Sequence, residues 1–315
     1  MTGLGVAGGL LQAVVIVGGA PLLLGLMRQV RARMEGRAGP GVGQPWRDLR
    51  KQLRKESITP RGTSEMFRVA PVLTVAMTLV VAVVAPFVTV ASPLPGVADL
   101  FVVVALLAHG TVVIALAGLD TGTAFGGMGA SREVTILALV EPTALVAIFA
   151  LSVPVGSTAL PAIVGSAVDD PARVLSPASL LAAVALAIVI VAETGRLPVD
   201  NPATHLELTM VHEAMVLEYA GPRLALIELG AALRLAVYLG LLATLFVPWG
   251  IATDAGVVAL AVGVVAFVVK VGLLGGALAA AEVFLAKLRL FRVPELLAGS
   301  FLLALLAVTA AFVLA

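Results

Sequence analysis

The stretch Glu193–Gly221, ETGRLPVDNPATHLELTMVHEAMVLEYAG, lies between two long apolar segments and carries five carboxylates, at Glu193, Asp200, Glu207, Glu213 and Glu218. A carboxylate beside a lipid bilayer needs water, a cation or a proton, because an uncompensated charge there is costly. The competing interpretation is a solvated loop with ordinary surface carboxylates. The stretch is therefore a candidate functional region, and its flanks indicate a membrane protein.

The composition of the 315-residue chain supports a membrane location, with 60% hydrophobic and 12% charged residues. Soluble domains carry about 25% charged residues. Because a helix crosses the bilayer in about 20 residues, we predict an all-α polytopic bundle, a single membrane domain over residues 1–315. Eight transmembrane helices are expected, at Leu4–Met27, Val69–Ala91, Leu100–Leu119, Val134–Val153, Ser179–Ala192, Leu224–Trp249, Ala255–Ala281 and Leu296–Ala315.

Basic residues are concentrated on one side of this predicted bundle. Eleven of the 20 Lys and Arg lie between Arg28 and Arg68, whereas Arg173 alone falls in a loop of the opposite side. The positive-inside rule then predicts a multi-pass protein of the inner or plasma membrane with both termini outside. The first segment lacks a charged n-region, so we expect a retained helix and not a signal peptide.

Two loops on the predicted cytoplasmic side have distinctive sequences. The first, RQVRARMEGRAGPGVGQPWRDLRKQLRKE at Arg28–Glu56, contains a Gly-Pro-Gly turn, and its part Trp46–Leu53 has the pattern of an interfacial amphipathic helix. The second, GLDTGTAFGGMGASRE at Gly118–Glu133, lacks the Gly-Lys-Ser/Thr ending of a phosphate loop, which argues against nucleotide binding. Attraction to anionic lipids and a plain turn between helices explain these loops equally well.

The pattern Glu-Thr-Gly-Arg-x-Pro-x-Asp from Glu193, with Glu-Tyr-Ala-Gly from Glu218, resembles the membrane subunit that respiratory complex I (NADH dehydrogenase), as its subunit 1, shares with energy-converting [NiFe] hydrogenases. Within that superfamily, GLDTG and GASRE resemble the hydrogenase branch of formate hydrogenlyase subunit 4 and hydrogenase-4 component C. The segment VDNPATH departs from the complex I version, where an acidic residue follows the proline. This departure argues against a quinone site.

The resemblance implies a membrane anchor and energy-coupling subunit of a group 4 [NiFe] hydrogenase or formate hydrogenlyase-like complex. Such a chain is not catalytic alone and links peripheral redox chemistry to proton or ion translocation. Implied partners are peripheral [NiFe] hydrogenase-like and iron–sulfur subunits, antiporter-like membrane subunits and the lipid bilayer, with no nucleic acid. Because the chain has no cysteine, it cannot ligate an iron–sulfur cluster through thiolates. We therefore expect no cofactor in this chain, and the iron–sulfur clusters and [NiFe] centre in partner subunits.

The resemblance also assigns roles to two loops. The basic docking loop 28–68 and the glycine-containing loop would receive the peripheral arm, through Arg37, Gly39, Pro40, Gln44, Pro45, Arg47, Asp48, Arg50, Asp120, Arg132 and Glu133. The acidic loop 193–223 would be organised by Arg196, Pro198, Asp200 and Tyr219.

Several charged residues fall at predicted membrane depth. Glu141 lies eight residues beyond Glu133, which carries it about 12 Å into its span, and Lys270 and Arg234 fall near the middle of theirs. Glu228 and Arg234 are six residues apart and face different sides of one helix, so each needs a partner on another helix or water. The residues expected to couple proton or ion movement are Glu141, Glu193, Glu207, Glu213, Glu218, Glu228 and Lys270.

A metal site is not expected. His205 and His212 share a helical face, but about 10 Å of rise separates them, too far for one ion. Three other functions stay open at this point: a complex I-type subunit that lines a quinone site, an independent ion transporter and a passive structural anchor. The chain shows no convincing internal repeat of the kind that transporters have.

Overall fold

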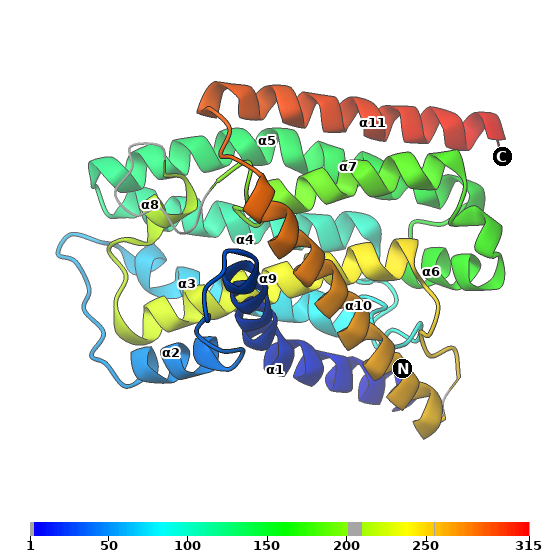
Figure 1. Ribbon diagram of the computed structural model, residues 1–315, viewed down its shortest axis with the longest axis horizontal. Helices are drawn as coiled ribbons and strands as arrows, with labels where there is room; N and C mark the ends of the chain where they lie inside the picture. Colours follow the sequence, from blue (N-terminus) through cyan, green and yellow to red (C-terminus); the bar gives the residue numbers. More distant parts are fainter. Residues whose placement is uncertain (1–2, 201–209, 255, 315) are drawn as a thin grey trace.

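The computed structural model describes residues 3–200, 210–254 and 256–314, which form eleven α-helices (Figure 1). Seven of them, α1, α3, α4, α5, α9, α10 and α11, are long and apolar enough to cross a membrane, and α7 is a shorter apolar helix of 17 residues. The helices are α1 Gly3–Met34, α2 Gln44–Leu53, α3 Glu65–Val84, α4 Leu100–Asp120, α5 Ala124–Ser152, α6 Leu160–Asp169, α7 Pro177–Glu193, α8 His212–Val216, α9 Gly221–Phe246, α10 Val257–Phe284 and α11 Val293–Leu314. The predicted all-α polytopic fold is confirmed.

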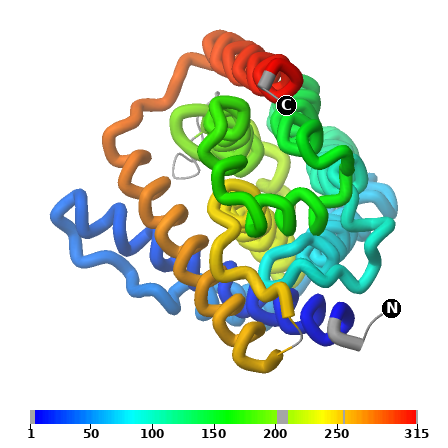
Figure 2. Tube along the Cα trace, turned by 90° about the vertical axis from the view of Figure 1, so that its right-hand side faces the viewer, coloured from blue at the N-terminus to red at the C-terminus, as the bar shows by residue number. Residues whose placement is uncertain are grey.

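Most of the long helices run roughly side by side and α10 crosses them at an angle, with the α2 and α8 end of the bundle opposite the end where α11 finishes (Figure 1). Viewed along the bundle, α9 lies inside and α10 and α11 lie at the periphery (Figure 2). The most apolar part of α9 is 83% buried, against 17% for α10. Because most of α9 is enclosed by protein, a charge in its buried part must be neutralised within the chain.

Two predicted loops are largely helical. Residues 28–34 belong to α1 and residues 44–53 form α2, which confirms the short amphipathic helix expected there. The prediction of a long glycine-containing loop at residues 118–133 is wrong, because α4 continues to Asp120 and α5 begins at Ala124. Thr123 caps the new helix by accepting a hydrogen bond from the Gly126 N–H at 3.2 Å.

The glycines that suggested a loop serve close helix packing instead. A Cβ on Gly126 would lie 2.3 Å from the carbonyl oxygen of Gly118 on α4, and one on Gly129 would lie 2.8 Å from the carbonyl oxygen of Val211. Glycine at these two positions therefore lets α5 approach its neighbours.

The Gly-Pro-Gly turn is fixed against α1 by a single side chain. Gln29 Nε2 donates to the Ala38 carbonyl at 3.0 Å, and Gln29 Oε1 accepts from the Gly41 N–H at 3.0 Å. Gly39 and Gly41 have φ of 73° and 86°, a conformation that glycine adopts without steric penalty. The turn thereby leads directly into α2.

A contact with the middle of α1 positions α2. Pro21 lies inside α1 and cannot donate the helical hydrogen bond, which weakens the helix there. Trp46 of α2 donates from Nε1 to the Gly18 carbonyl at 3.1 Å, while Pro45 and Leu49 are buried. This docking places the polar face of α2 beside α9.

We expect Gly25→Ala to destabilise this arrangement by about 1–3 kcal/mol, the usual range for overpacking. A Cβ at Gly25 would lie 1.8 Å from the carbonyl oxygen of Val42, so the turn that leads into α2 must move. The matched control is Gly19→Ala in the same helix, where nothing lies within 4 Å and alanine should stabilise by about 0.5–1 kcal/mol. Thermal unfolding in detergent measures both, and equal melting temperatures for the two variants would contradict the packing argument.

Candidate functional site: a charged cavity beside the central helix

A cavity of about 490 Å³ lies between α1, α2, α3, α4, α7, α8, α9 and α10. Its wall contains apolar side chains from α1, α2 and α9, such as Leu24, Leu49 and Ile227. Its charged lining consists of six acidic residues, Asp48, Glu193, Asp200, Glu213, Glu228 and Glu282, and four basic residues, Arg28, Arg31, Arg196 and Arg234. An excess of acidic groups around a cavity favours water and cations inside it.

The most buried part of the lining is an ion pair between two helices. Arg234 of α9 donates from Nη2 to the Glu193 carboxylate at the end of α7 and to the Thr111 hydroxyl of α4. The two charged side chains are only 8% and 4% exposed. The Thr111 hydroxyl also lies 3.5 Å from Glu193 Oε2. Three helices therefore meet at one neutralised pair of charges.

Glu228 and Arg234 do not pair, as their spacing predicted. Glu228 accepts a hydrogen bond from Gln52 Nε2 of α2 at 2.7 Å. Each of the two α9 charges thus has a partner on another helix, which confirms the expected interhelical contacts.

A second ion cluster, which the sequence prediction missed, connects α1, α10 and the segment after α7. Glu282 is 3% exposed, pairs with Arg31 through Oε2 and lies 3.7 Å from Arg196 Nη1 through Oε1. The predicted spans end at Met27 and Ala281, just short of both partners. The apolar signal stops there although the helices continue to Met34 and Phe284.

Residues predicted to organise the acidic loop hold the segment between α7 and Asp200 in place. Asp200 accepts from Lys287 Nζ at 2.9 Å and from the His212 N–H at 3.4 Å, and the Pro198 carbonyl accepts from the Leu288 N–H at 2.8 Å. Burial lowers the pKa of the Arg196 guanidinium, and the nearby Glu282 carboxylate opposes this effect. These contacts fix the segment against the chain that joins α10 to α11.

Tyr219 holds the start of α9 in place. Its ring stacks on Phe67 with centroids 4.0 Å apart, and its hydroxyl donates to the Phe67 carbonyl at 2.8 Å. Burial raises the pKa of the Tyr219 hydroxyl, so it remains a hydrogen-bond donor at neutral pH.

Four of the predicted coupling residues lie away from the cavity or outside the described chain. Glu141 is partly exposed on α5 and Glu218 is exposed before α9, and neither lines the cavity. Lys270 donates to the Val247 carbonyl at 2.6 Å and to the Trp249 carbonyl, both just after α9. Glu207 lies outside the described residues.

The docking prediction for Glu133 is contradicted by its burial. Glu133 is 8% exposed inside α5. Glu133 was assigned to docking because a loop was predicted at its position. Since α5 begins at Ala124, Glu133 lies on a helix and is buried inside the bundle. Glu133 is therefore a buried residue of the bundle and not part of an exposed docking surface.

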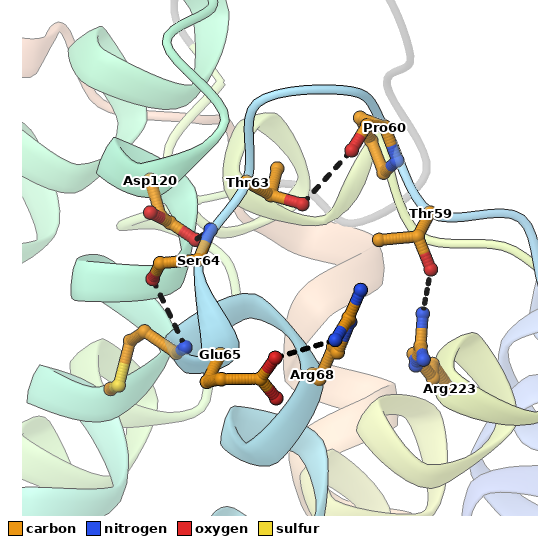
Figure 3. Close-up of polar contacts among 9 residues, drawn as sticks. Thr59, Pro60, Thr63, Ser64, Glu65, Arg68, Asp120 and Arg223 are labelled. Atoms are coloured by element: carbon orange, nitrogen blue, oxygen red, sulfur yellow. Dashed lines mark hydrogen bonds and ion pairs between the residues drawn. The ribbon is translucent and has the colours of Figure 1, made fainter.

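The remaining docking residues lie at the α2 end of the bundle, where several hold neighbouring segments together. Asp120 accepts from the Ser64 N–H at 2.8 Å and so joins the end of α4 to the start of α3, while Arg223 contacts Thr59 (Figure 3). Arg132 donates to the Met210 carbonyl at 2.9 Å. The side chains of Arg37, Arg47 and Arg50 are exposed, and Asp48 lies 3.7 Å from Arg28.

The fold and the cavity define a multi-pass helical membrane protein with an internal cluster of ion pairs. The family profile described as NADH dehydrogenase matches residues 8–313. The chain belongs to this family, which confirms the predicted resemblance.

Similar proteins indicate which branch of the family the chain resembles. Hydrogenase-4 component C of Escherichia coli (strain K12) is 35% identical over 298 residues, which cover 95% of this chain and 93% of that protein. Formate hydrogenlyase subunit 4 of the same organism is 37% identical over 241 residues, covering 76% and 77%. A subunit of the NADH-quinone oxidoreductase of Syntrophobacter fumaroxidans is 31% identical over 243 residues, covering 72% of each chain.

A solved structure shares the fold. A chain of the membrane-bound sulfane sulfur reductase, an archaeal respiratory membrane complex, superposes with a TM-score of 0.80 at 21% identity, covering 97% of this chain and 98% of that chain. These relatives are subunits of multi-subunit membrane complexes, so this chain has partner subunits.

His212 should remain neutral through the physiological pH range. Burial and the nearby Arg234 charge together lower the pKa of its imidazole to about 4, against the opposing effect of Asp200. In the unfolded chain the pKa is about 6.5, so between pH 6.5 and 4 the unfolded state binds the extra proton and the folded state loses stability as pH falls.

We expect His212→Gln to flatten this loss of stability below pH 6.5, because glutamine does not titrate. Denaturant unfolding at a series of pH values measures the effect, with the exposed His109→Gln of α4 as the matched control. Identical pH profiles for His212→Gln and wild type would show that the imidazole is not held neutral.

Proposed function

We propose that this chain is the membrane anchor and energy-coupling subunit of a group 4 [NiFe] hydrogenase or formate hydrogenlyase-like complex. It lies in the inner or plasma membrane with the α2 end in the cytoplasm and both termini outside. The names of the similar E. coli proteins and the basic residues of the α2 end support this assignment. The chain carries no redox centre of its own in this proposal.

The observation that carries the proposal is the charged cavity with the Glu193–Arg234 pair in its wall. A carboxylate in the wall of a polar cavity can take up and release a proton, whereas its amide cannot. The pair also joins α4, α7 and α9, so a change of charge in the cavity alters the contacts between these three helices. Such a site converts an electrostatic change at the cytoplasmic end into proton or ion movement.

Peripheral [NiFe] hydrogenase-like and iron–sulfur subunits are the proposed partners at the α2 end, with antiporter-like subunits within the membrane. Exposed basic side chains lie on α2 and directly after it, at Arg47, Arg50, Lys51 and Arg54, and Leu53 and Ile58 in the same region are exposed apolar side chains. Arginine beside apolar residues is typical of protein interfaces. The iron–sulfur clusters and the [NiFe] centre would belong to these partners.

The second candidate function is a complex I-type subunit that lines a quinone site. The apolar part of the cavity wall and the likeness to a subunit of NADH-quinone oxidoreductase favour it. Extraction of the purified complex with organic solvent distinguishes the two, because a stoichiometric quinone supports the second candidate and its absence supports the first.

We predict that Glu193→Gln lowers the number of ions translocated per electron by at least about tenfold, because loss of a proton-transfer group usually has an effect of that size or more. Glu141→Gln should have a weaker effect. The assay is electron transfer with translocation in sealed vesicles that contain the intact complex. Glu56→Gln, an exposed residue at the same end, is the control.

The outcome separates coupling from passive anchoring. If Glu193→Gln assembles and translocates like wild type, this carboxylate is structural and the chain is an anchor. If electron transfer continues while translocation falls, the coupling role stands.

We predict that the double charge reversal Arg47→Glu with Arg50→Glu releases the peripheral subunits and leaves this chain in the membrane. Both side chains are exposed on α2, and reversed charges would repel a complementary surface. Native gels of solubilised membranes measure retention, with Asp254→Lys, exposed after α9, as the control. Full retention of the peripheral subunits in the double variant would place the docking surface elsewhere.

A further inference from the structure

His109 lies on the outer surface of a membrane-spanning helix, near its middle. The side chain is exposed, and α4 runs from Leu100 to Asp120, so either end of the helix is about 15 Å away at about 1.5 Å per residue. The hydrocarbon core of a bilayer is about 30 Å thick. The imidazole therefore lies near the centre of the membrane, too deep to reach the lipid headgroups.

A hydrogen bond within α4 fixes which ring nitrogen of His109 carries the proton. Its Nδ1 lies 2.6 Å from the carbonyl oxygen of Ala105, one turn earlier in the helix. Because a carbonyl oxygen only accepts, Nδ1 is the donor, and in the neutral imidazole Nε2 is then an acceptor. Among the residues that the structure describes, none donates a hydrogen bond to this Nε2.

Other ionisable side chains near the middle of their helices are satisfied within the chain. Arg234 is paired with Glu193, and Lys270 donates to the Val247 carbonyl at 2.6 Å. His109 differs from them because its acceptor nitrogen has no donor in the described chain. A polar group without a hydrogen bond is costly in hydrocarbon, where lipid tails offer no donor.

The surface around His109 is an apolar stripe along α4. Val112 and Leu116 follow it at the spacing that keeps side chains on one helical face, and they are 36% and 46% exposed. Phe101, nearer the start of the helix, is 51% exposed. The helix packs between α3 and α5, and these three helices lie on the side of the bundle away from α10 (Figure 2). The stripe is therefore open to a neighbour within the membrane.

We propose that the outer face of α4 around His109 is a docking surface for a membrane-spanning helix of a partner subunit. That helix carries a hydroxyl, amide or indole side chain, which donates a hydrogen bond to His109 Nε2. Such hydrogen bonds hold membrane helices together, and the apolar stripe supplies the packing on either side. The relatives are subunits of membrane complexes, so a partner chain is available to cover this face.

This surface is separate from the exposed basic residues of α2, which the proposed function assigns to the peripheral subunits. The inference rests on the chain having partner subunits and is independent of whether the complex moves ions.

Photo-crosslinking in the intact complex tests the docking surface. A p-benzoylphenylalanine replaces Val112 in the otherwise wild-type chain, the native membranes are irradiated, and mass spectrometry identifies the adducts. We expect an adduct with a membrane-spanning helix of another subunit that carries a hydroxyl, amide or indole side chain. The same probe at Leu116 should capture the same subunit. Adducts with lipid alone, with a second copy of this chain or with a peripheral subunit would overturn the proposal.

Replacement of His109 tests the hydrogen bond itself. His109→Leu removes the acceptor and should weaken binding of the captured subunit in mild detergent about threefold, the usual effect of one hydrogen bond between membrane helices. His109→Gln keeps an acceptor oxygen and should bind that subunit like wild type. Equal binding in His109→Leu and wild type would also overturn the proposal. If His109→Leu fails to insert, the adducts decide alone, because they are measured with His109 in place.

Neither measurement requires ion movement or electron transfer. Failure of this inference is therefore distinguishable from failure of the proposed function, which the translocation assay in sealed vesicles decides.

Discussion

The ion pair between Glu193 and Arg234 is the constraint on which the rest of the structure depends. Arg234 lies in the middle of the central helix and is only 7% exposed, so the bundle must supply its counter-charge. The partner comes from the end of α7, and Thr111 of α4 completes the contact. Removing one member of a buried ion pair leaves the other charge without a partner, which lowers the free energy of unfolding by about 3–5 kcal/mol. Three helices are therefore fixed relative to one another by one electrostatic requirement.

The other charged contacts extend this arrangement toward the end where α2 lies. Glu282 with Arg31 and Arg196 ties α10 to α1, and Asp200 with Lys287 ties the segment after α7 to the chain after α10. Gln52 of α2 reaches Glu228 of α9. A cavity framed by such contacts responds to charge, because any change in one partner alters the stability of a helix contact. This is the physical basis for assigning a coupling role to a chain of this family.

The sequence predicted much of the fold and only part of the site. Apolar segments of about 20 residues locate membrane helices reliably, and the spacing of Glu228 and Arg234 excluded their pairing. The partner of Arg234 was not predictable, because it depends on how α7 and α9 are rotated and shifted against each other. Glu133 was misassigned because glycines that permit close helix packing look like loop residues in a sequence. Glu282 was missed because the helix continues beyond its apolar part.

A double-mutant cycle on Glu193 and Arg234 tests the central claim most directly. The free energies of unfolding of Glu193→Gln, Arg234→Gln and the double variant would be measured in mixed micelles. The account predicts that the double variant loses at least about 1 kcal/mol less stability than the sum of the two single losses, since residues in one ion pair couple by about 0.5–3 kcal/mol. Additive losses would contradict it, because they would show that the two side chains do not interact in the folded protein.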